Sequence, residues 1–129
     1  MTKHPARIGL IVFLIALVAA CAPTVERQPV RYQAAPAALI AEIAAYGLEQ
    51  PPTTTMTPFR VESESATSIV LLSEVTGVFP IAPRYTRLTF SVVQQGDVST
   101  ITVIAMGHNA EDTAERFLLH LATVFPRVF

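Results

Sequence analysis

The sequence predicts a single two-layer α+β domain. In it a four-stranded antiparallel meander has one helix before it and one after it, in the order αββββα. Three observations predict this fold. Apolar residues recur at helical spacing at both ends of residues 36–129. Four stretches between these ends alternate or run apolar, as strands do, and turn-forming residues separate them. Two helices can cover one face of such a sheet.

The first helix is expected over residues 36–46. Pro36 suits the first helical position, where its missing amide hydrogen would have no partner. An apolar stripe follows, formed by Leu39, Ile40, Ile43 and Tyr46. Gly47 fits the left-handed position after a helix, and Leu48 can then fold back on Ile43 in a Schellman-type end. Residues 50–57, with adjacent prolines and four threonines, are expected to form a loop.

Four strands are expected after this loop. Residues 59–64 alternate between Phe, Val or Ser and charged side chains, which predicts a half-buried strand. Residues 68–75 are apolar on both faces and are therefore placed centrally in the sheet. Residues 87–93 and 99–105 each alternate and form a hairpin. Its turn is expected at residues 94–97, where Gly96 can adopt a positive φ.

A second helix is expected after the last strand. Asn109 is a favoured N-cap residue, and Glu111 and Asp112 lie in the first turn, where the helix dipole favours negative charge. Pro126 ends the helix. The expected apolar stripe consists of Ala114, Phe117, Leu118, Leu121, Ala122 and Phe125.

The amino-terminal residues 1–20 have the layout of a secretory signal peptide. Lys3 and Arg7 precede a charge-free run of 13 residues, 8–20, and Cys21 follows small residues. A permanent membrane helix needs about 20 apolar residues. The alternative of an uncleaved membrane helix is therefore disfavoured by length, and also by the Ala-Pro pair that follows Cys21.

The sequence Val18-Ala19-Ala20-Cys21 fits every position of a lipobox, so residues 1–21 resemble the processing signal of bacterial lipoproteins. The resemblance covers about one sixth of the chain and is specific for processing. It implies cleavage before Cys21 and a thioether-linked diacylglycerol on its sulfur. The protein would then be lipid-anchored in the cell membrane or outer membrane, facing the periplasm or the exterior. Ala22 stands where an aspartate would signal inner-membrane retention, which favours the outer membrane if the cell has two.

Residues 21–35 are expected to join the lipid to the domain. They include two prolines, have no sustained period and indicate a flexible tether. An alternative is that Val30 and Tyr32 alternate into a short edge strand. The predicted organisation is thus a signal peptide over 1–20, a lipidated cysteine with its tether over 21–35, and one domain over 36–129.

The composition of the mature chain bounds its partners. Without residues 1–20 it has 109 residues, with seven arginines and ten carboxylates and a formal net charge of −3. A mildly acidic surface argues against a nucleic-acid partner. Cys21 is the single cysteine, so once it is acylated no thiol remains for a disulfide, a metal or catalysis.

Few residues suggest chemistry. His108 lies near Glu111 and Asp112 in sequence, so an acid/base pair is conceivable, but a turn followed by an acidic helix start is favoured. His120 is interpreted as a surface or half-buried structural residue. No phosphate-binding glycine loop, nucleophile elbow or metal motif is present in the sequence. We therefore expect no enzyme activity, no cofactor and no metal.

Two surfaces are candidates for binding a protein. Residues 77–85, between the second and third expected strands, place aromatic, proline and arginine residues on a loop. The alternative is that Phe79 and Ile81 fold back as a lid over the sheet edge. The second surface is the sheet face away from the helices. The candidate residues are Phe79, Ile81, Arg84 and Tyr85 in the loop and Val70 and Leu72 on the face, with Val93 and Ile104 beside them.

The expected function is that of a cell-envelope lipoprotein with a non-catalytic domain. The domain would bind another envelope protein or a second copy of itself. One alternative is a carrier or sensor of a small apolar ligand held between the helices and the sheet. A third hypothesis is a hydrolase that uses His108.

Overall fold

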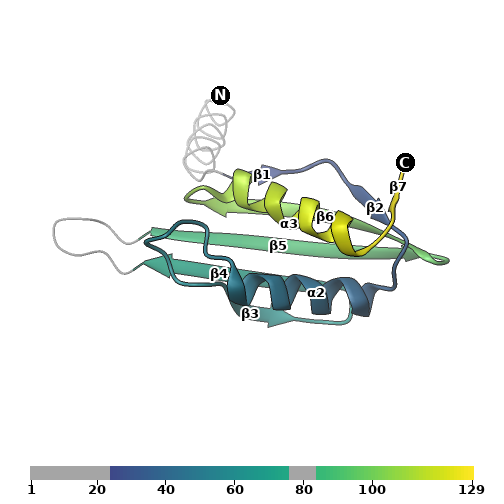
Figure 1. Cartoon of the computed structure of the whole chain (residues 1–129), viewed down its shortest axis with the longest axis horizontal. Helices are drawn as coiled ribbons and strands as arrows, with labels where there is room; N and C mark the ends of the chain where they lie inside the picture. The colour runs from purple at the N-terminus through teal and green to yellow at the C-terminus, as the bar shows by residue number, and fades with distance from the viewer. Residues whose placement is uncertain (1–23, 76–83) are drawn as a thin grey trace, which may run out of the picture.

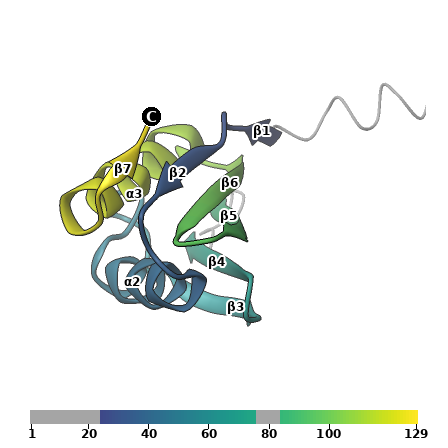
Figure 2. The same ribbon diagram turned by 90° about the vertical axis from the view of Figure 1, so that its right-hand side faces the viewer.

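The computed structural model describes residues 24–75 and 84–129, which form an antiparallel sheet with two helices on one face (Figure 1). Figure 2 views the sheet nearly edge-on and shows both helices on the same side of it. The α+β class is confirmed. The sheet has seven strands within the described residues, so the expected count of four is wrong.

The strands lie in the order β3-β4-β5-β6-β2-β7, and β1 also pairs with β6. All of these pairings are antiparallel. In chain order the elements are β1 (Thr24–Glu26), β2 (Val30–Tyr32), α2 (Pro36–Glu49), β3 (Arg60–Glu64), β4 (Ser68–Val75), β5 (Arg84–Gln95), β6 (Val98–Gly107), α3 (Ala110–Val124) and β7 (Arg127–Val128).

The amino-terminal strands correct the expected tether. Val30 pairs with Ile101 and Tyr32 with Ser99 of β6, and both side chains are buried in the core. The Tyr32 hydroxyl donates a hydrogen bond to the backbone oxygen of Leu118 at 2.8 Å. Residues 24–26 and 30–32 therefore belong to the sheet. The alternative of a short strand at Val30 and Tyr32 is confirmed, but this strand lies between β6 and β7 and is not an edge strand. The tether prediction failed because each strand has only three residues and follows a proline, so neither gives a clear periodic signal.

The central strands follow the expected meander. β4 spans the predicted residues and lies between β3 and β5. β5 and β6 form the expected hairpin, with Gln95 paired to Val98 and Gly96 at a φ of 67°. Both strands run past their predicted ends, and β5 begins at Arg84. The extra residues of β5 were missed because they are mostly polar and exposed, so their alternation carries no hydrophobic contrast. The extra residues of β6, Val98, Met106 and Gly107, are half-buried.

β3 departs from the half-buried pattern that the sequence predicts. Phe59 is buried just before the strand, but all five strand residues are exposed. The register shifts between Val61 and Ser63, as in a β-bulge. β3 is an edge strand. Charged side chains together with a bulge are typical protection of an edge against pairing with other chains.

α2 begins at Pro36 as expected but continues through Gly47 to Glu49. The predicted Schellman end is wrong, and Leu48 is 63% exposed rather than folded back. A β-carbon on Gly47 would lie 3.0 Å from Leu71 Cδ1 and 3.3 Å from Phe59 Cβ. Gly47 is therefore explained by close packing of the helix on the sheet, not by a turn.

α3 covers its predicted residues and, as predicted, begins directly after Asn109. Asn109 has a φ of 55° and makes no side-chain cap. Its amide nitrogen Nδ2 instead donates a hydrogen bond to the Pro52 backbone oxygen at 3.0 Å, which ties the loop after α2 to α3. The predicted N-cap position is therefore correct, but the Asn109 side chain does not cap the helix. The helix ends before Pro126, and Ala122 of the expected stripe is exposed.

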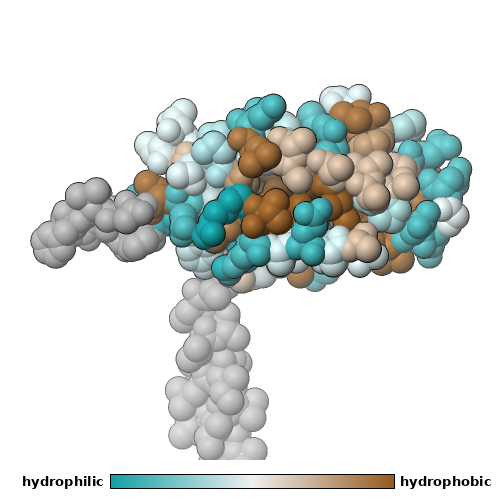
Figure 3. Space-filling view, turned by 90° about the horizontal axis from the view of Figure 1, so that it is seen from below, coloured by the Kyte–Doolittle hydropathy of each residue, from teal (hydrophilic) through white to brown (hydrophobic). Residues whose placement is uncertain are grey.

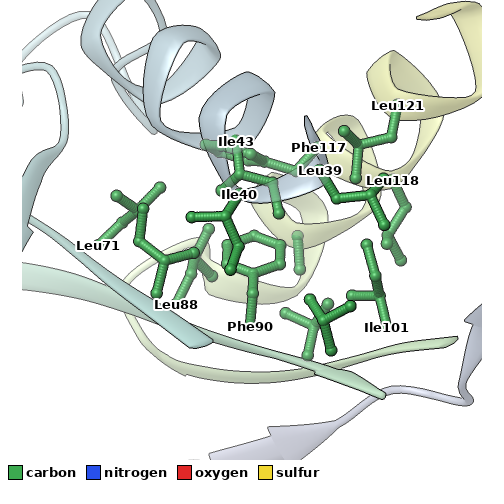
Figure 4. Close-up of a cluster of buried hydrophobic side chains, with 14 of the residues drawn as sticks. Leu39, Ile40, Ile43, Leu71, Leu88, Phe90, Ile101, Phe117, Leu118 and Leu121 are labelled. Atoms are coloured by element: carbon green, nitrogen blue, oxygen red, sulfur yellow. The ribbon is translucent and has the colours of Figure 1, made fainter. Parts of the chain in front are cut away.

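Side chains from both helices and the sheet interdigitate in one core (Figure 4). Phe117 of α3 lies at its centre. Its ring centroid is 5.4 Å from that of Phe90 on β5, 5.6 Å from Phe59 and 4.8 Å from Tyr46 of α2. These rings fill the space between the two layers.

Candidate functional site

The structure separates the residues that the sequence placed on one binding loop. Arg84 and Tyr85 are the first residues of β5 and pair with Val75 and Glu74, so placing them in the loop was wrong. Tyr85 is 40% exposed, and the guanidinium carbon of Arg87 lies 5.8 Å from its ring centroid. Phe79 and Ile81 lie outside the described residues.

Leu72 lies on the sheet face away from the helices but is only 7% exposed. It pairs across the sheet with Arg60 on one side and Arg87 on the other. Arg60 forms an ion pair with Glu74 at 3.1 Å, and Arg87 contacts both carboxylate oxygens of Glu62 at 2.8 and 3.1 Å. The hydrogen bond from Arg87 lowers the pKa of Glu62. Leu72 therefore lies between the two ion-paired arginines and has little exposed surface for a partner to contact.

The rest of this face is mixed in character. Val93 is 60% exposed and Ile104 is 36% exposed, while Val70 is half-buried. Thr89 lies between Val70 and Ile104 in the register, which separates the two apolar side chains. Apolar residues also lie among hydrophilic ones along the edge formed by α2 and β3 (Figure 3). The continuous apolar face expected from the sequence is thus interrupted by hydroxyl groups.

The two histidines of the described residues have different surroundings. The His108 side chain is exposed, and within residues 24–75 and 84–129 no hydrogen bond or ion pair joins it to Glu111 or Asp112. Its backbone nitrogen donates a hydrogen bond to the Tyr85 oxygen at 2.8 Å, so His108 is held as a turn residue. This geometry does not favour the hydrolase hypothesis, which remains a prediction.

His120 is half-buried, as the sequence indicates, and joins the two helices. Its Nε2 lies 2.7 Å from Oε1 of Glu42, and its ring stacks on Tyr46 with the centroids 4.1 Å apart. Neither partner could be predicted, because Glu42 is 78 residues away and lies on the polar side of another helix. The cluster has the contacts of a structural clasp between α2 and α3.

A surface groove between the amino-terminal strands and α3 is the site that sequence reasoning missed. We name it the β1 groove. It has a volume of about 390 Å³ and is lined by Val25, Glu26, Arg27, Gln28, Pro29, Val30, Glu111, Glu115, Leu118, Leu119 and Arg127. Apolar side chains from both walls lie beside charged ones, and Leu119 is 55% exposed. A smaller hollow of about 260 Å³ shares Val25 and Glu111 and extends the groove along α3.

An ion-pair cluster holds the two walls of the β1 groove together. Arg27 follows β1. Its guanidinium donates a close hydrogen bond to the Glu115 carboxylate and lies 3.8 Å from the Glu111 carboxylate. Its backbone nitrogen donates to the Val103 oxygen of β6 at 3.0 Å. The position of the groove is therefore fixed from both the strand and the helix side.

The outer edge of β1 is unpaired within the described sheet, because β1 pairs with β6 alone. The Arg27 amide points toward β6, so by strand alternation the neighbouring Glu26 amide points to the outer edge. β2 pairs with β6 on the same side as β1 does. The outer edge of β2 is occupied by β7, with Arg31 opposite Val128. The β1 groove thus lies along the same outer edge of the sheet that β7 occupies next to β2.

The interior offers less support for the alternative functions. The space between helices and sheet, where the alternative hypothesis places an apolar ligand, is occupied by Phe90, Phe117 and their neighbours. Among residues 24–75 and 84–129, no group of three or more His, Cys, Asp or Glu side chains could hold a metal ion. No described helix is long and apolar enough to span a membrane. Both alternative functions remain predictions.

Comparison with protein-family models, with curated proteins and with solved structures finds no match to this chain.

Proposed function

We propose that this protein is a cell-envelope lipoprotein, anchored through Cys21, whose non-catalytic domain binds an extended segment of a protein partner in the β1 groove. The proposal combines the lipobox-like residues 18–21 with the open edge of β1. The unpaired edge beside the groove is the observation that carries it. Strand addition to such an edge is a common mode of peptide recognition.

The composition of the β1 groove fits a peptide better than a small molecule. Backbone groups of β1 would pair with the segment, while Leu119 and Val25 would contact its alternate side chains. The charged groups along the groove are of both signs, with Glu26, Glu111 and Glu115 beside Arg27 and Arg127. Such charges favour orientation of a partner over bulk electrostatic attraction.

A matched pair of leucine substitutions tests the location of the site. Leu119→Glu places a charge in the β1 groove, and Leu48→Glu places one at a similarly exposed leucine on α2, at 55% and 63% exposure. The anchored protein is crosslinked in cells and purified, and bound proteins are quantified by mass spectrometry. We expect a stoichiometric partner with the unsubstituted chain and Leu48→Glu, and its loss with Leu119→Glu. Equal recovery with both variants contradicts the proposal.

A proline substitution tests strand addition itself. Glu26→Pro removes an amide hydrogen that points to the open edge, so it leaves the ladder with β6 intact. Glu26→Ala removes the same side chain but keeps the amide. Loss of the partner with Glu26→Pro and its retention with Glu26→Ala is the expected result. If Glu26→Pro binds as well as Glu26→Ala, the partner does not pair with β1. Recovery of a second copy as the groove-dependent partner would identify the occupant as this chain itself.

A further inference from the structure

The distance between the proposed anchor and the folded sheet is short. Cys21 precedes the first strand residue, Thr24, by three residues. Three residues span at most about 10 Å, whereas the 14-residue linker expected from the sequence could have reached about 50 Å. Thr24 itself is fixed, because it pairs with Met106 in the β1–β6 ladder. A lipid on Cys21 would therefore hold this end of the sheet at the bilayer surface.

We propose that the domain stands end-on to the membrane, with the surface around Tyr85 and Thr24 in contact with the lipid headgroups and the β5–β6 turn directed away from them. This orientation rests on the proposed lipid anchor. The β5–β6 turn, at residues 95–98, lies at the opposite end of the two longest strands (Figure 1). The end of the sheet formed by Thr24 and Tyr85 therefore faces the lipid surface.

The residues at the anchored end suit a headgroup environment. Met106 and Arg87 follow Thr24 across the sheet in one register row, and Tyr85 lies two residues from Arg87 on the same face. At about 4.8 Å between strands and 3.4 Å along them, Tyr85 is about 12 Å from Thr24. A tyrosine has an apolar ring and a polar tip, which is why it is enriched at membrane interfaces. The neighbouring Arg87–Glu62 pair stays solvated among headgroups.

The rest of the sheet face has neither the charge nor the apolar area that would bind it flat on a membrane. Its described arginines are Arg31, Arg60 and Arg87, and the guanidinium groups of Arg60 and Arg87 are paired with carboxylates. The mature chain also has a net charge of −3, so we expect only weak electrostatic attraction of this face to anionic lipid. Its exposed apolar residues, Val93 and Ile104, are separated by hydroxyl side chains. The short connection to Cys21 is therefore the main determinant of orientation.

The chain has no tryptophan, so one introduced tryptophan reports its own surroundings. Tyr85→Trp and Val93→Trp form a matched pair, because both positions lie on β5, face the same side of the sheet and are exposed. Eight residues of strand place them about 27 Å apart. The lipidated full chain is purified from bacterial membranes and reconstituted into phosphatidylcholine vesicles whose acyl chains are brominated near the headgroup, so that the bromine quenches nearby tryptophan.

We expect the Tyr85→Trp chain to lose emission in brominated vesicles and to shift to the blue, while Val93→Trp keeps its emission. Equal quenching at both positions would mean that the domain lies flat, and quenching at neither would mean that it stands clear of the bilayer; both results overturn the orientation. Adding Cys21→Ser to Tyr85→Trp should abolish the quenching. The mass of the purified chain separates the two proposals. A lipid on Cys21 with the wrong quenching pattern refutes the orientation alone, whereas an absent lipid refutes the anchor and the orientation with it.

Discussion

Replacing Tyr32 tests whether the amino-terminal residues form a folded strand or a flexible tether. The change in the free energy of unfolding can be estimated from the contacts of Tyr32. The side chain is fully buried, and its hydroxyl donates a hydrogen bond to the Leu118 oxygen at 2.8 Å. Truncating a buried aromatic residue to alanine costs about 3–5 kcal/mol. Loss of the hydrogen bond adds about 1 kcal/mol. We therefore expect Tyr32→Ala to lower the free energy of unfolding by about 4–6 kcal/mol, a large part of the ~5–15 kcal/mol typical of a domain.

The assay is urea unfolding of the purified chain, followed by far-ultraviolet circular dichroism. Tyr32→Ala should also lower the melting temperature by about 20 °C, since each kcal/mol shifts a domain of this size by roughly 4 °C. Arg31→Ala is the matched control, because Arg31 is the exposed neighbour in the same strand. It should change stability by no more than about 0.5 kcal/mol. A Tyr32→Ala chain as stable as Arg31→Ala would show that residues 24–35 are a linker after all.

Three further predictions concern pH and packing. Burial raises the pKa of Tyr32 to about 12 from 10.0. The contribution of Tyr32 to stability is therefore present below pH 10 and lost as pH rises toward about 12. The urea midpoint of the unsubstituted chain should fall over this pH range, and that of Tyr32→Phe should lack this fall. Gly47→Ala should destabilise by about 1 kcal/mol in the same assay, because contact with Leu71 Cδ1 costs about 1–3 kcal/mol and helix propensity returns only about 1. Glu62→Gln should cost less than about 1 kcal/mol, since its pair with Arg87 is exposed. Because the hydrogen bond from Arg87 lowers the pKa of Glu62, the pair stabilises above pH 4.5 and this effect is lost as pH falls, which a pH series of wild type and variant would detect.

The parts of the fold that the sequence predicts are those with strong hydrophobic periodicity. Both helices, β4 and the β5–β6 hairpin were predicted, because their apolar residues repeat over several turns or pairs. Gly96 at a positive φ was predicted from the turn-forming residues around it. These elements depend on contacts near in sequence or on a face that must be buried.

The errors arose where distant parts of the chain decide the local structure. Val30 and Tyr32 are strand residues because β6 offers them an edge about 70 residues away, and nothing near them in sequence indicates this. Gly47 looks like a helix end, but it is needed where the helix meets Leu71. Asn109 occupies the N-cap position, yet its side-chain amide binds the Pro52 oxygen instead of capping the helix.

The candidate site was predicted less well than the fold. Val70 and Leu72 were placed on the correct face, but the ion pairs of Arg60 and Arg87 that cover Leu72 depend on the cross-strand register. The β1 groove has no signal in the sequence, because residues 25–30, which form one of its walls, have the composition of a tether. An Arg-Glu contact across 88 residues has no signal in a single sequence.

The mass of the mature polypeptide tests the central claim most directly. If Cys21 is the acylated amino terminus, the intact mass will correspond to residues 21–129 plus a diacylglyceryl group, and the acyl mass will map to the first peptide. A chain that keeps residues 1–20, or one that begins elsewhere with unmodified sulfur, would contradict both the anchoring and the end-on orientation.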